Sequence, residues 1–530
     1  MLARIRERQA PWDIIVIGGG ATGAGIAVDA ASRGYAVLLL EREDFGKGTS
    51  SRSTKLVHGG VRYLEQGNIS LVMEALKERG ILLENAPHLV HDLPFIVPNY
   101  SWWETPFYGI GLKIYDLLAG KYGFGKSRIL SLEETLERLP NIRQDGLRGG
   151  VVYHDGQFDD ARLLIALMIT AAEHGASTVN YAPVVELTRD ADGFVNGVVG
   201  LDRESGERFT APAKVVINAT GIFTDELRRM ADPEAPAMLA PSQGIHLVFD
   251  RSFLSGDTAI MVPHTTDGRV LFAIPWHGHT LVGTTDTPID GPSYEPAPFD
   301  HEVQFVLDTA GQYLSRPPER SDILSVFVGI RPLVKTAGSN SSKTSALSRD
   351  HTIHIDATGL LTIVGGKWTT YRHMAEDVVD QAMTLGRLDE TPCVTRSLRI
   401  HGYVPRSAES GGLACADDPL AVYGADASLI REIAEADREL EQPLDPDLPC
   451  IGAQIVWAAR NEMARTLDDV LSRRTRALLL NAAAAIRMAP GAAAILAREL
   501  GRDQAWESEQ VVTFLELAAQ YNVASEAGTA

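Results

Sequence analysis

The sequence predicts an α/β protein in which a dinucleotide-binding domain is interleaved with a second domain rich in β-sheet and followed by a helical C-terminal domain. Near the N-terminus an apolar run leads into a glycine-rich turn, and two later segments, 214–221 and 361–371, repeat the pattern of an apolar run followed by glycine. From Ala427 to Tyr521, apolar residues recur at helical spacing. A chain of 530 residues is also too long for one core, so two or three domains are expected.

Composition and charge narrow the class of protein. The chain carries 49 Lys and Arg against 69 Asp and Glu, a net charge of −20, which excludes a general nucleic-acid binder because polyanions would be repelled. Any anionic substrate must therefore be met by locally clustered Arg and Lys. The three cysteines, Cys393, Cys415 and Cys450, show no CxxC spacing, which suits a reducing cytosol and no disulfide framework.

Two kinds of feature are not expected, a membrane span and a metal centre. The first twelve residues lack the apolar region of a signal peptide. The Ala-rich stretch Ala477–Ala497 is interrupted by Arg487 and Pro490, short of the ~20 apolar residues that a spanning helix needs. His277 and His279 form a tempting pair, but no third ligand has suitable spacing, so they are interpreted as loop histidines.

The first glycine-rich turn predicts a dinucleotide site. Asp13–Ile17 has the character of a strand buried on both faces, and Val37–Leu40 that of its neighbour. Between them stands the pattern G-x-G-x-x-G, formed by Gly18, Gly20 and Gly23. These glycines allow a tight turn, close approach of a pyrophosphate and close helix packing, and the following helix directs its positive end at the phosphates. Glu41, after the second strand, would accept hydrogen bonds from ribose hydroxyls.

The later segments favour FAD over NAD. The run Val215–Asn218 ends in Ala219-Thr220-Gly221, which resembles the ATG segment that passes beside FAD in flavoproteins with two dinucleotide-binding domains. The run Leu361–Val364 leads into Gly365-Gly366 and a helix whose N-terminus would stabilise negative charge on a reduced flavin. No second G-x-G-x-x-G occurs, so no NAD(P)H domain is predicted. The segment Thr178–Ala213 contains alternating strands joined by Asp-Gly and Ser-Gly turns, which is typical of an inserted β-meander.

The segment after Glu41 would run past the pyrophosphate toward the flavin ring. Three serines, Ser50, Ser51 and Ser53, can donate hydrogen bonds to phosphate oxygens. The pair Gly59-Gly60 lets the backbone approach the ring, which leaves Arg62 and Tyr63 directed into the substrate space.

Five motifs in this order give a close resemblance to a known family. They are "SSRSTKLVHGGVRYLE", "GIRPLV", "SRDHTI", "VGGKWTTYR" and "NEMARTLDDVLSRRTR". From about Asp13 to about Glu516, the chain resembles FAD-dependent glycerol-3-phosphate dehydrogenase, the enzyme linked to the respiratory chain. The resemblance implies a glutathione-reductase-like FAD-binding domain of the D-amino-acid-oxidase superfold. It also implies oxidation of sn-glycerol 3-phosphate to dihydroxyacetone phosphate, with electrons passed on to a quinone.

The resemblance also assigns roles in the site. Arg62, Arg331 and Arg349 would bind the substrate anion, since guanidinium is the natural bidentate partner of phosphate. Lys367 is expected near the substrate hydroxyl and the flavin, with Arg331 also in the catalytic set. His246 would take the hydroxyl proton, and Tyr63 is the competing candidate. Residues expected at the cofactor are Gly18, Gly20, Ala21, Thr22, Gly23, Glu41, Arg42, Thr49, Ser50, Ser51, Ser53, Lys55, Leu56, His58, Gly59, Gly60, Ala219, Thr220, Gly221, Gly366, Lys367 and Thr369.

The expected domains are discontinuous. Residues 1–88, 151–240 and 340–390 are assigned to FAD binding, and residues 89–150 and 241–339 to the substrate domain. Residues 391–530 form the helical domain, for which docking against the FAD domain or formation of a homodimer is a more natural role than catalysis. No calcium-binding loop of the EF-hand type occurs in it.

The stretch Asn99–Arg128 has the composition of a membrane-surface segment. Aromatic and basic residues surround a short apolar helix predicted over Ile110–Leu118. These are Trp102, Trp103, Phe107, Tyr108, Tyr115, Tyr122, Phe124, Lys113, Lys121, Lys126 and Arg128. We therefore expect a cytoplasmic protein peripherally associated with the inner face of the plasma membrane. The alternative is that these aromatics pack as an ordinary helical excursion over the substrate domain.

Three other functions share the predicted fold. An oxidase of glycerol 3-phosphate would hand the electrons to oxygen, and the motifs barely separate it from the quinone-linked enzyme. An amine or amino-acid oxidase would need a carboxylate clamp, which the basic cluster favours less than a phosphate site. The third alternative function is that of a non-catalytic scaffold stabilised by FAD.

Overall fold

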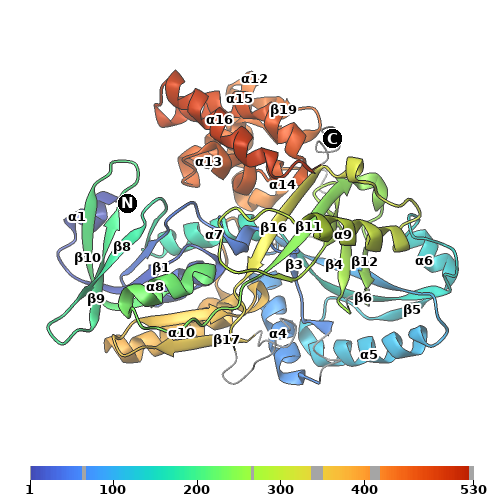
Figure 1. Cartoon of the computed structure of the whole chain (residues 1–530), viewed down its shortest axis with the longest axis horizontal. Coiled ribbons are helices and arrows are strands. Elements are labelled where there is room, and N and C mark those ends of the chain that lie inside the picture. The colour runs from blue at the N-terminus through green and yellow to red at the C-terminus, as the bar shows by residue number, and fades with distance from the viewer. Residues whose placement is uncertain are drawn as a thin grey trace.

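A computed structural model of the chain shows three packed parts (Figure 1). It describes residues 2–61, 67–263, 265, 268–335, 350–405 and 418–523. One sheet with its helices lies at the left of the view, a second sheet at the right, and the C-terminal helices cover the top of both (Figure 1). The predicted α/β class, with a helical C-terminal part, is confirmed.

The first sheet is built around buried parallel strands. Its path runs β17-β18-β10-β1-β2-β7, and β8 and β9 extend it from β10. The bounds are β1 Trp12–Ile17, β2 Val37–Leu40, β7 Ser177–Val179, β8 Val184–Arg189, β9 Val195–Leu201, β10 Arg208–Asn218, β17 His351–Ile355 and β18 Leu361–Gly365. Ile14 pairs with Val37 on one side and Val215 on the other, and all three are buried. The apolar runs thus form parallel strands as predicted, and β8–β10 form the meander.

Among the described residues, five helices cover this sheet, and two of them begin after its glycine turns. They are α1 Leu2–Glu7, α2 Ala21–Ser32, α7 Asp160–Glu173, α8 Thr224–Ala231 and α10 Tyr371–Gly386. Helix α2 packs between α7 and α10 within one apolar core. It begins directly after the first glycine turn, and α10 begins after the Gly365-Gly366 turn and a short 3₁₀ segment, Trp368–Thr370.

The second sheet has ten strands in the order β15-β11-β14-β13-β12-β4-β6-β3, with β16 on β11 and β5 on β6. The bounds are β3 Leu56–Val57, β4 Val90–Asn99, β5 Arg128–Leu130, β6 Gly149–Phe158, β11 Ser242–Asp250, β12 Ala259–Val262, β13 Leu271–Trp276, β14 His279–Gly283, β15 Thr287–Pro288 and β16 Ser325–Arg331. Its helices are α4 Ile69–Asn85, α5 Glu104–Ala119, α6 Leu132–Arg138 and α9 Asp300–Tyr313.

The sheets divide the chain differently from the predicted domain boundaries. Strand β3 and all of β6 except its first two residues fall in ranges assigned to FAD binding, yet β3 pairs with β6 and β6 with β4 in the second sheet. The long antiparallel pairing of β6 with β4, from Val90 to Asn99, decides this placement, and no local pattern in the sequence predicts such a partner. His279 begins β14 and is therefore in a strand, whereas His277 lies in the turn before it.

The C-terminal part is mainly helical. It contains α11 Ala427–Ala436, α12 Arg438–Glu441, β19 Pro443–Asp445, β20 Leu448–Ile451, α13 Gly452–Asn461, a π-helix Asp469–Arg474, α14 Ala477–Leu480, α15 Ala482–Leu500 and α16 Gln504–Ala519. The two-stranded hairpin and the π-helix are additions to the predicted all-helical domain. Among the described residues, no helix combines the length and the apolar character needed to cross a membrane.

Candidate active site

A cavity of about 1030 Å³ is lined by residues of both sheets and of the segment that joins β2 to β3. Of the positions predicted to hold the cofactor, it is lined by Gly18, Gly20, Ala21, Thr22, Glu41, Arg42, Thr49, Ser50, Ser53, Leu56, His58, Gly60, Ala219, Thr220, Gly221, Gly366, Lys367 and Thr369. Gly23, Ser51, Lys55 and Gly59 are not among its lining residues. The fold therefore brings the three predicted glycine segments to one space.

The first glycine turn has the geometry of a pyrophosphate site. Gly18 has φ +113°, and a Cβ there would lie 2.5 Å from the carbonyl oxygen of Ala219. A Cβ on Gly23 would lie 1.9 Å from the carbonyl oxygen of Gly18. At Gly20, in contrast, a Cβ would meet only the Ser50 hydroxyl at 3.1 Å, and this residue faces the cavity. The backbone here is open to a phosphate because no side chain covers it.

Short hydrogen bonds join the turn to the segments around it. The Glu41 carboxylate accepts from the backbone N–H groups of Gly19 (2.6 Å) and Glu43 (2.8 Å), and its burial raises its pKa above the ordinary value. The Ser50 hydroxyl accepts from the N–H of Ala21 (2.9 Å). The Trp368 indole N–H donates to the Ser50 carbonyl (2.9 Å), so the first and last glycine segments are held together.

Arg42 lines the cavity two residues after the end of β2. Its guanidinium carbon is 4.8 Å from the ring centroid of Phe223 and 4.9 Å from that of Tyr294, and these two rings stack at 4.3 Å. The contact joins residues that are far apart in sequence, so sequence reasoning did not find Phe223 or Tyr294.

His246 lies on β11 and is 3% exposed. Its Nε2 lies 2.9 Å from the hydroxyl of Thr54, and its ring stacks on Phe327 with centroids 4.9 Å apart. Burial, with Lys55 and Arg331 nearby, holds the pKa of His246 well below its ordinary 6.5, so the ring is neutral at neutral pH. A neutral imidazole beside a hydroxyl is able to accept a proton.

Two residues around His246 were missed by sequence reasoning. Thr54 carries the only hydroxyl that the described residues place on the His246 ring. Gly283 pairs with His246 in the register of β11 and β14, and a Cβ on it would lie 2.4 Å from the imidazole Cδ2. This glycine makes room for the ring. Thr54 stands within the quoted "STKL" motif, which is the one signal that could have found it.

Arg331 ends β16 and lines the cavity with a side chain that is 24% exposed. Its guanidinium donates to the Thr285 carbonyl (2.9 Å) and the Thr284 hydroxyl (3.2 Å). It also contacts Asp286 (3.2 Å), and Arg269 reaches the other oxygen of that carboxylate (3.8 Å). Two guanidinium groups share one carboxylate, so the local charge is positive, as an anion site requires. Arg269 was not predicted.

Comparison with known proteins decides the family. A family model described as FAD dependent oxidoreductase matches residues 13–372, and one described as the C-terminal domain of alpha-glycerophosphate oxidase matches residues 358–507. The chain belongs to the FAD-dependent oxidoreductase family. The cofactor predicted from the three glycine segments is therefore confirmed as FAD.

Individual relatives of this FAD-dependent oxidoreductase resemble nearly all of it. The mitochondrial glycerol-3-phosphate dehydrogenase of Homo sapiens is 41% identical over 535 residues, which cover 96% of this chain and 73% of the human one. That of Arabidopsis thaliana is 41% identical over 537 residues, covering 94% and 85%. The X-ray structure of glycerol-3-phosphate dehydrogenase from Bacillus halodurans, complexed with FAD, has 30% identity and a TM-score of 0.79, covering 98% of this chain and 96% of that one.

The residues of this FAD-dependent oxidoreductase fit the cofactor. The open glycine turn accommodates a pyrophosphate, Glu41 lies where ribose hydroxyls are expected, and the Gly366 turn lines the same cavity. Lys367 lines it too. Arg62, Tyr63 and Arg349 lie outside the described residues, so their predicted roles at the substrate stay predictions.

The side chains of Lys55 and Ser53, both predicted to lie at the cofactor, form hydrogen bonds with other groups of the protein. The Lys55 ammonium donates to Asp160 and to the Ser51 carbonyl, both at 2.7 Å, and burial lowers its pKa to about 8. The Ser53 hydroxyl donates to the same carboxylate at 2.7 Å. The structure therefore places the Lys55 amine behind the cavity wall, where it supports the wall and does not face the cofactor space.

His277 and His279 both contact other groups of the protein. His277 Nε2 contacts Asp159 at 2.9 Å, and His279 Nδ1 contacts the His277 carbonyl at 2.8 Å. Within the ranges that the structure describes, no group of three or more His, Cys, Asp and Glu side chains could hold a metal ion.

Proposed function

We propose that this protein oxidises sn-glycerol 3-phosphate to dihydroxyacetone phosphate and passes the electrons to a membrane quinone. The substrate oxidation rests on relatives named glycerol-3-phosphate dehydrogenase that match nearly the whole chain. The observation of this structure that carries it is the juxtaposition, in one cavity, of the glycine segments, the neutral His246 and the positively charged Arg331–Arg269 pair.

Each part of the substrate has a group in the cavity suited to it. When bound, FAD accepts the hydride that leaves C2 of the substrate. The C2 hydroxyl must lose its proton at the same time, and the neutral imidazole of His246 is the group able to take it, in place of its contact with Thr54. The phosphate dianion requires cations, for which Arg331, Arg269 and Lys367 line the cavity. By resemblance Arg62 and Arg349 would join them.

The acceptor part of the proposal rests on a group of apolar residues in the cavity wall. This wall contains Phe95, Tyr153, Met261, Val270 and Phe272. Helix α5 packs its inner side chains, Leu112 and Tyr115, into the same apolar cluster. A quinone ring arriving beside α5 would therefore meet an apolar surface continuous with the site.

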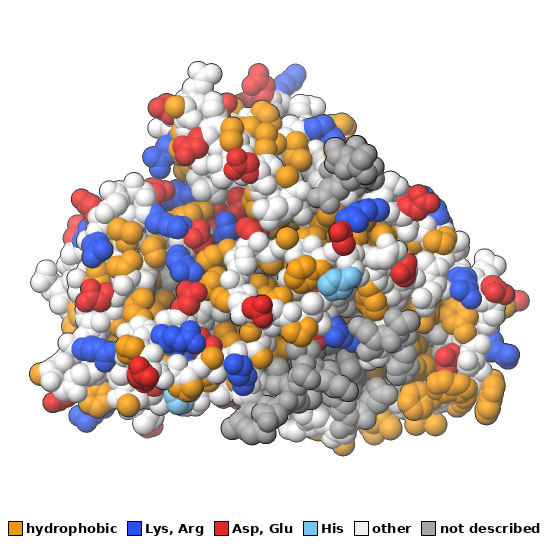
Figure 2. All heavy atoms as spheres, in the orientation of Figure 1, with side chains coloured by type: hydrophobic (Ala, Val, Ile, Leu, Met, Phe, Trp, Pro, Cys, Tyr) orange, Lys and Arg blue, Asp and Glu red, His pale blue; other side chains and the backbone are white. Residues whose placement is uncertain are grey.

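The outer face of α5 supports contact with a membrane surface. Side chains on successive turns are exposed: Trp103 46%, Phe107 51%, Ile110 65%, Ile114 45% and Leu117 80%, with Trp102 at 77% before the helix. Hydrophobic side chains gather at the lower right of Figure 2, where Figure 1 has α5. Lys121 and Lys126 are exposed just beyond the helix. A stripe this apolar, with lysines at its end, fits a peripheral protein on the anionic inner face of the plasma membrane.

Turnover with different acceptors tests the proposal. The rate of turnover of the purified protein with glycerol 3-phosphate is measured with three acceptors: a long-tailed quinone in vesicles, a water-soluble dye, and oxygen alone. The proposal predicts turnover with the quinone and the dye, and little peroxide with oxygen. Peroxide formation as fast as quinone reduction would instead identify an oxidase.

A further inference from the structure

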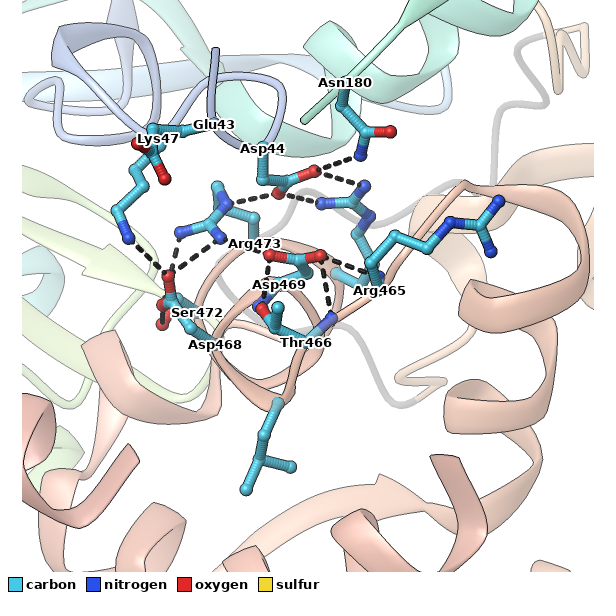
Figure 3. Close-up of polar contacts among 12 residues, drawn as sticks. Glu43, Asp44, Lys47, Asn180, Arg465, Thr466, Asp468, Asp469, Ser472 and Arg473 are labelled. Carbon is cyan, nitrogen blue, oxygen red and sulfur yellow. Dashed lines mark hydrogen bonds and ion pairs between the residues drawn. The ribbon is translucent and has the colours of Figure 1, made fainter. Parts of the chain in front are cut away.

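The C-terminal domain meets the cofactor-binding part at a buried cluster of acids and arginines (Figure 3). On one side is the π-helix Asp469–Arg474, and on the other is the segment 41–55, here called the cofactor loop. Arg473 and Arg474 are at most 2% exposed, and Asp44 of the cofactor loop is fully buried. Side chains of both sides point toward one another in the close-up (Figure 3).

Asp44 is the centre of the cluster. Arg474 donates to both of its oxygens, one of them at 2.9 Å, and Arg473 donates to the second. Asn180 donates to the first oxygen at 3.2 Å. Burial alone would raise the pKa of Asp44, but the two guanidinium groups outweigh it and hold that pKa below the ordinary value. The carboxylate is therefore ionised, and it depends on two arginines of another domain.

Two further contacts tie the same loop to the same domain. Lys47 donates to Asp468 at 3.2 Å, just before the π-helix. Arg476 donates to Asp159 at 2.7 Å and also to Asp160. The Asp160 carboxylate in turn accepts from the backbone N–H (3.0 Å) and the hydroxyl (2.7 Å) of Ser53 in the cofactor loop. The loop is thus anchored near its start, middle and end.

The other side of the cofactor loop forms part of the cavity wall. Its residues Gly46, Gly48, Thr49 and Ser50 line the cavity. The Gly46 N–H donates to the Gly19 carbonyl (3.0 Å), and Ser50 accepts from Ala21, so the loop closes on the pyrophosphate turn. A shift of Asp44 would therefore be transmitted to the phosphate-binding backbone.

We propose that Arg473, Arg474 and Arg476 are positioning residues for FAD: the C-terminal domain clamps the cofactor loop against the glycine turn, and retention of the flavin depends on that clamp. The "SRRTR" run then has a role beyond docking of the domain. A buried carboxylate that loses its arginine must gain water or a proton, and either change loosens the loop that carries it.

The rate of FAD release tests this proposal independently of turnover. In the holoprotein, Arg474→Met removes the charge and keeps most of the side-chain volume. The matched control is Arg33→Met, which breaks a buried ion pair with Asp29 (2.6 Å) at the C-terminal end of α2, the end away from the glycine turn. Release is followed by the rise in flavin fluorescence, at a temperature at which circular dichroism shows both variants folded.

The proposal predicts that Arg474→Met releases FAD at least about tenfold faster than Arg33→Met, a factor equivalent to about 1.4 kcal/mol. Arg474→Lys, which restores the charge, should return the rate to within about threefold of the unaltered protein. If Arg474→Met does not fold, Asp468→Asn is measured, since this residue is 14% exposed and contacts both Lys47 and Arg473. Equal release rates for Arg474→Met and Arg33→Met, or for Asp468→Asn and the unaltered protein, overturn the proposal.

Discussion

His246 is a buried base whose environment decides its protonation. The pKa of its ring is well below 6.5, first because of burial and then because Lys55 and Arg331 are nearby. The unfolded histidine binds a proton at higher pH than the folded one, so falling pH below 6.5 favours unfolding at this residue, and stability rises again toward neutral pH. His246 lines the cavity, and its role as the base there stays a prediction.

His246→Ala should lower the turnover number by roughly 100-fold or more, the usual range for a lost general base, with flavin content unchanged. The acid limb of kcat/KM in the unaltered protein should lie below pH 6.5, because the neutral imidazole becomes protonated only at low pH and then no longer acts as a base. That limb should vanish in the variant. An unchanged profile in His246→Ala would move the base to Tyr63 or to solvent.

Arg331→Leu should raise the KM for glycerol 3-phosphate by about ten- to a hundredfold, the worth of a charge-assisted phosphate contact of roughly 1.5–3 kcal/mol. Free glycerol serves as the control substrate, since it lacks the phosphate and should be nearly indifferent to the change. Arg251→Leu, at an exposed arginine beyond β11, is the control variant. An equal loss with glycerol would mean that Arg331 acts by holding Thr285 and Asp286 in place.

At the scale of elements, the glycine-to-helix units were predictable and the contacts between elements were not. The residues of β1, β2 and α2 carry their own pattern, because buried parallel strands are continuously apolar and the turn demands glycine. Helix α5 begins six residues before the predicted Ile110, because Glu104 accepts from the N–H groups of Tyr100 (2.7 Å) and Ser101 (2.8 Å) and so stabilises its first turn. Contacts such as that between Thr54 and His246 join segments that are far apart in the sequence, and no local pattern in the sequence predicts them.

The exposed face of α5 makes a separate prediction. Replacing Trp102, Trp103 and Phe107 together by Ser should move the protein from the membrane pellet to the soluble fraction, because the three exposed aromatic side chains that would insert into the lipid are lost. Turnover with a water-soluble dye should survive, and turnover with a long-tailed quinone should fall.

The matched control for that variant replaces equally exposed apolar residues elsewhere, Phe194 and Val512, which are 51% and 58% exposed on the β8–β9 turn and on α16. This control variant should remain in the membrane pellet. If the α5 variant still pellets and still reduces the quinone, the anchor lies elsewhere and α5 packs as an ordinary surface helix.

At the scale of the whole molecule, the chain crosses between the two sheets several times, and this is where sequence reasoning reached its limit. The five motifs predicted the family, and residues of four of them line the cavity, whereas those of "NEMARTLDDVLSRRTR" do not. The partition of β3 and β6 into the second sheet was not predicted, because it follows from pairings up to a hundred residues apart. The sequence predicted that the C-terminal domain docks against the FAD domain but not by which residues, and the structure buries Arg474 and Arg476 against Asp44 and Asp160.

The most direct test of the account is anaerobic mixing of the purified, yellow holoprotein with glycerol 3-phosphate. The account predicts that the visible flavin absorbance bleaches within the time of a turnover and that dihydroxyacetone phosphate forms in equal amount to the flavin reduced. Glycerol at the same concentration should leave the flavin oxidised, since the cationic groups would have no phosphate to bind. A flavin that stays oxidised with glycerol 3-phosphate, or that is bleached instead by an amino acid, would contradict it.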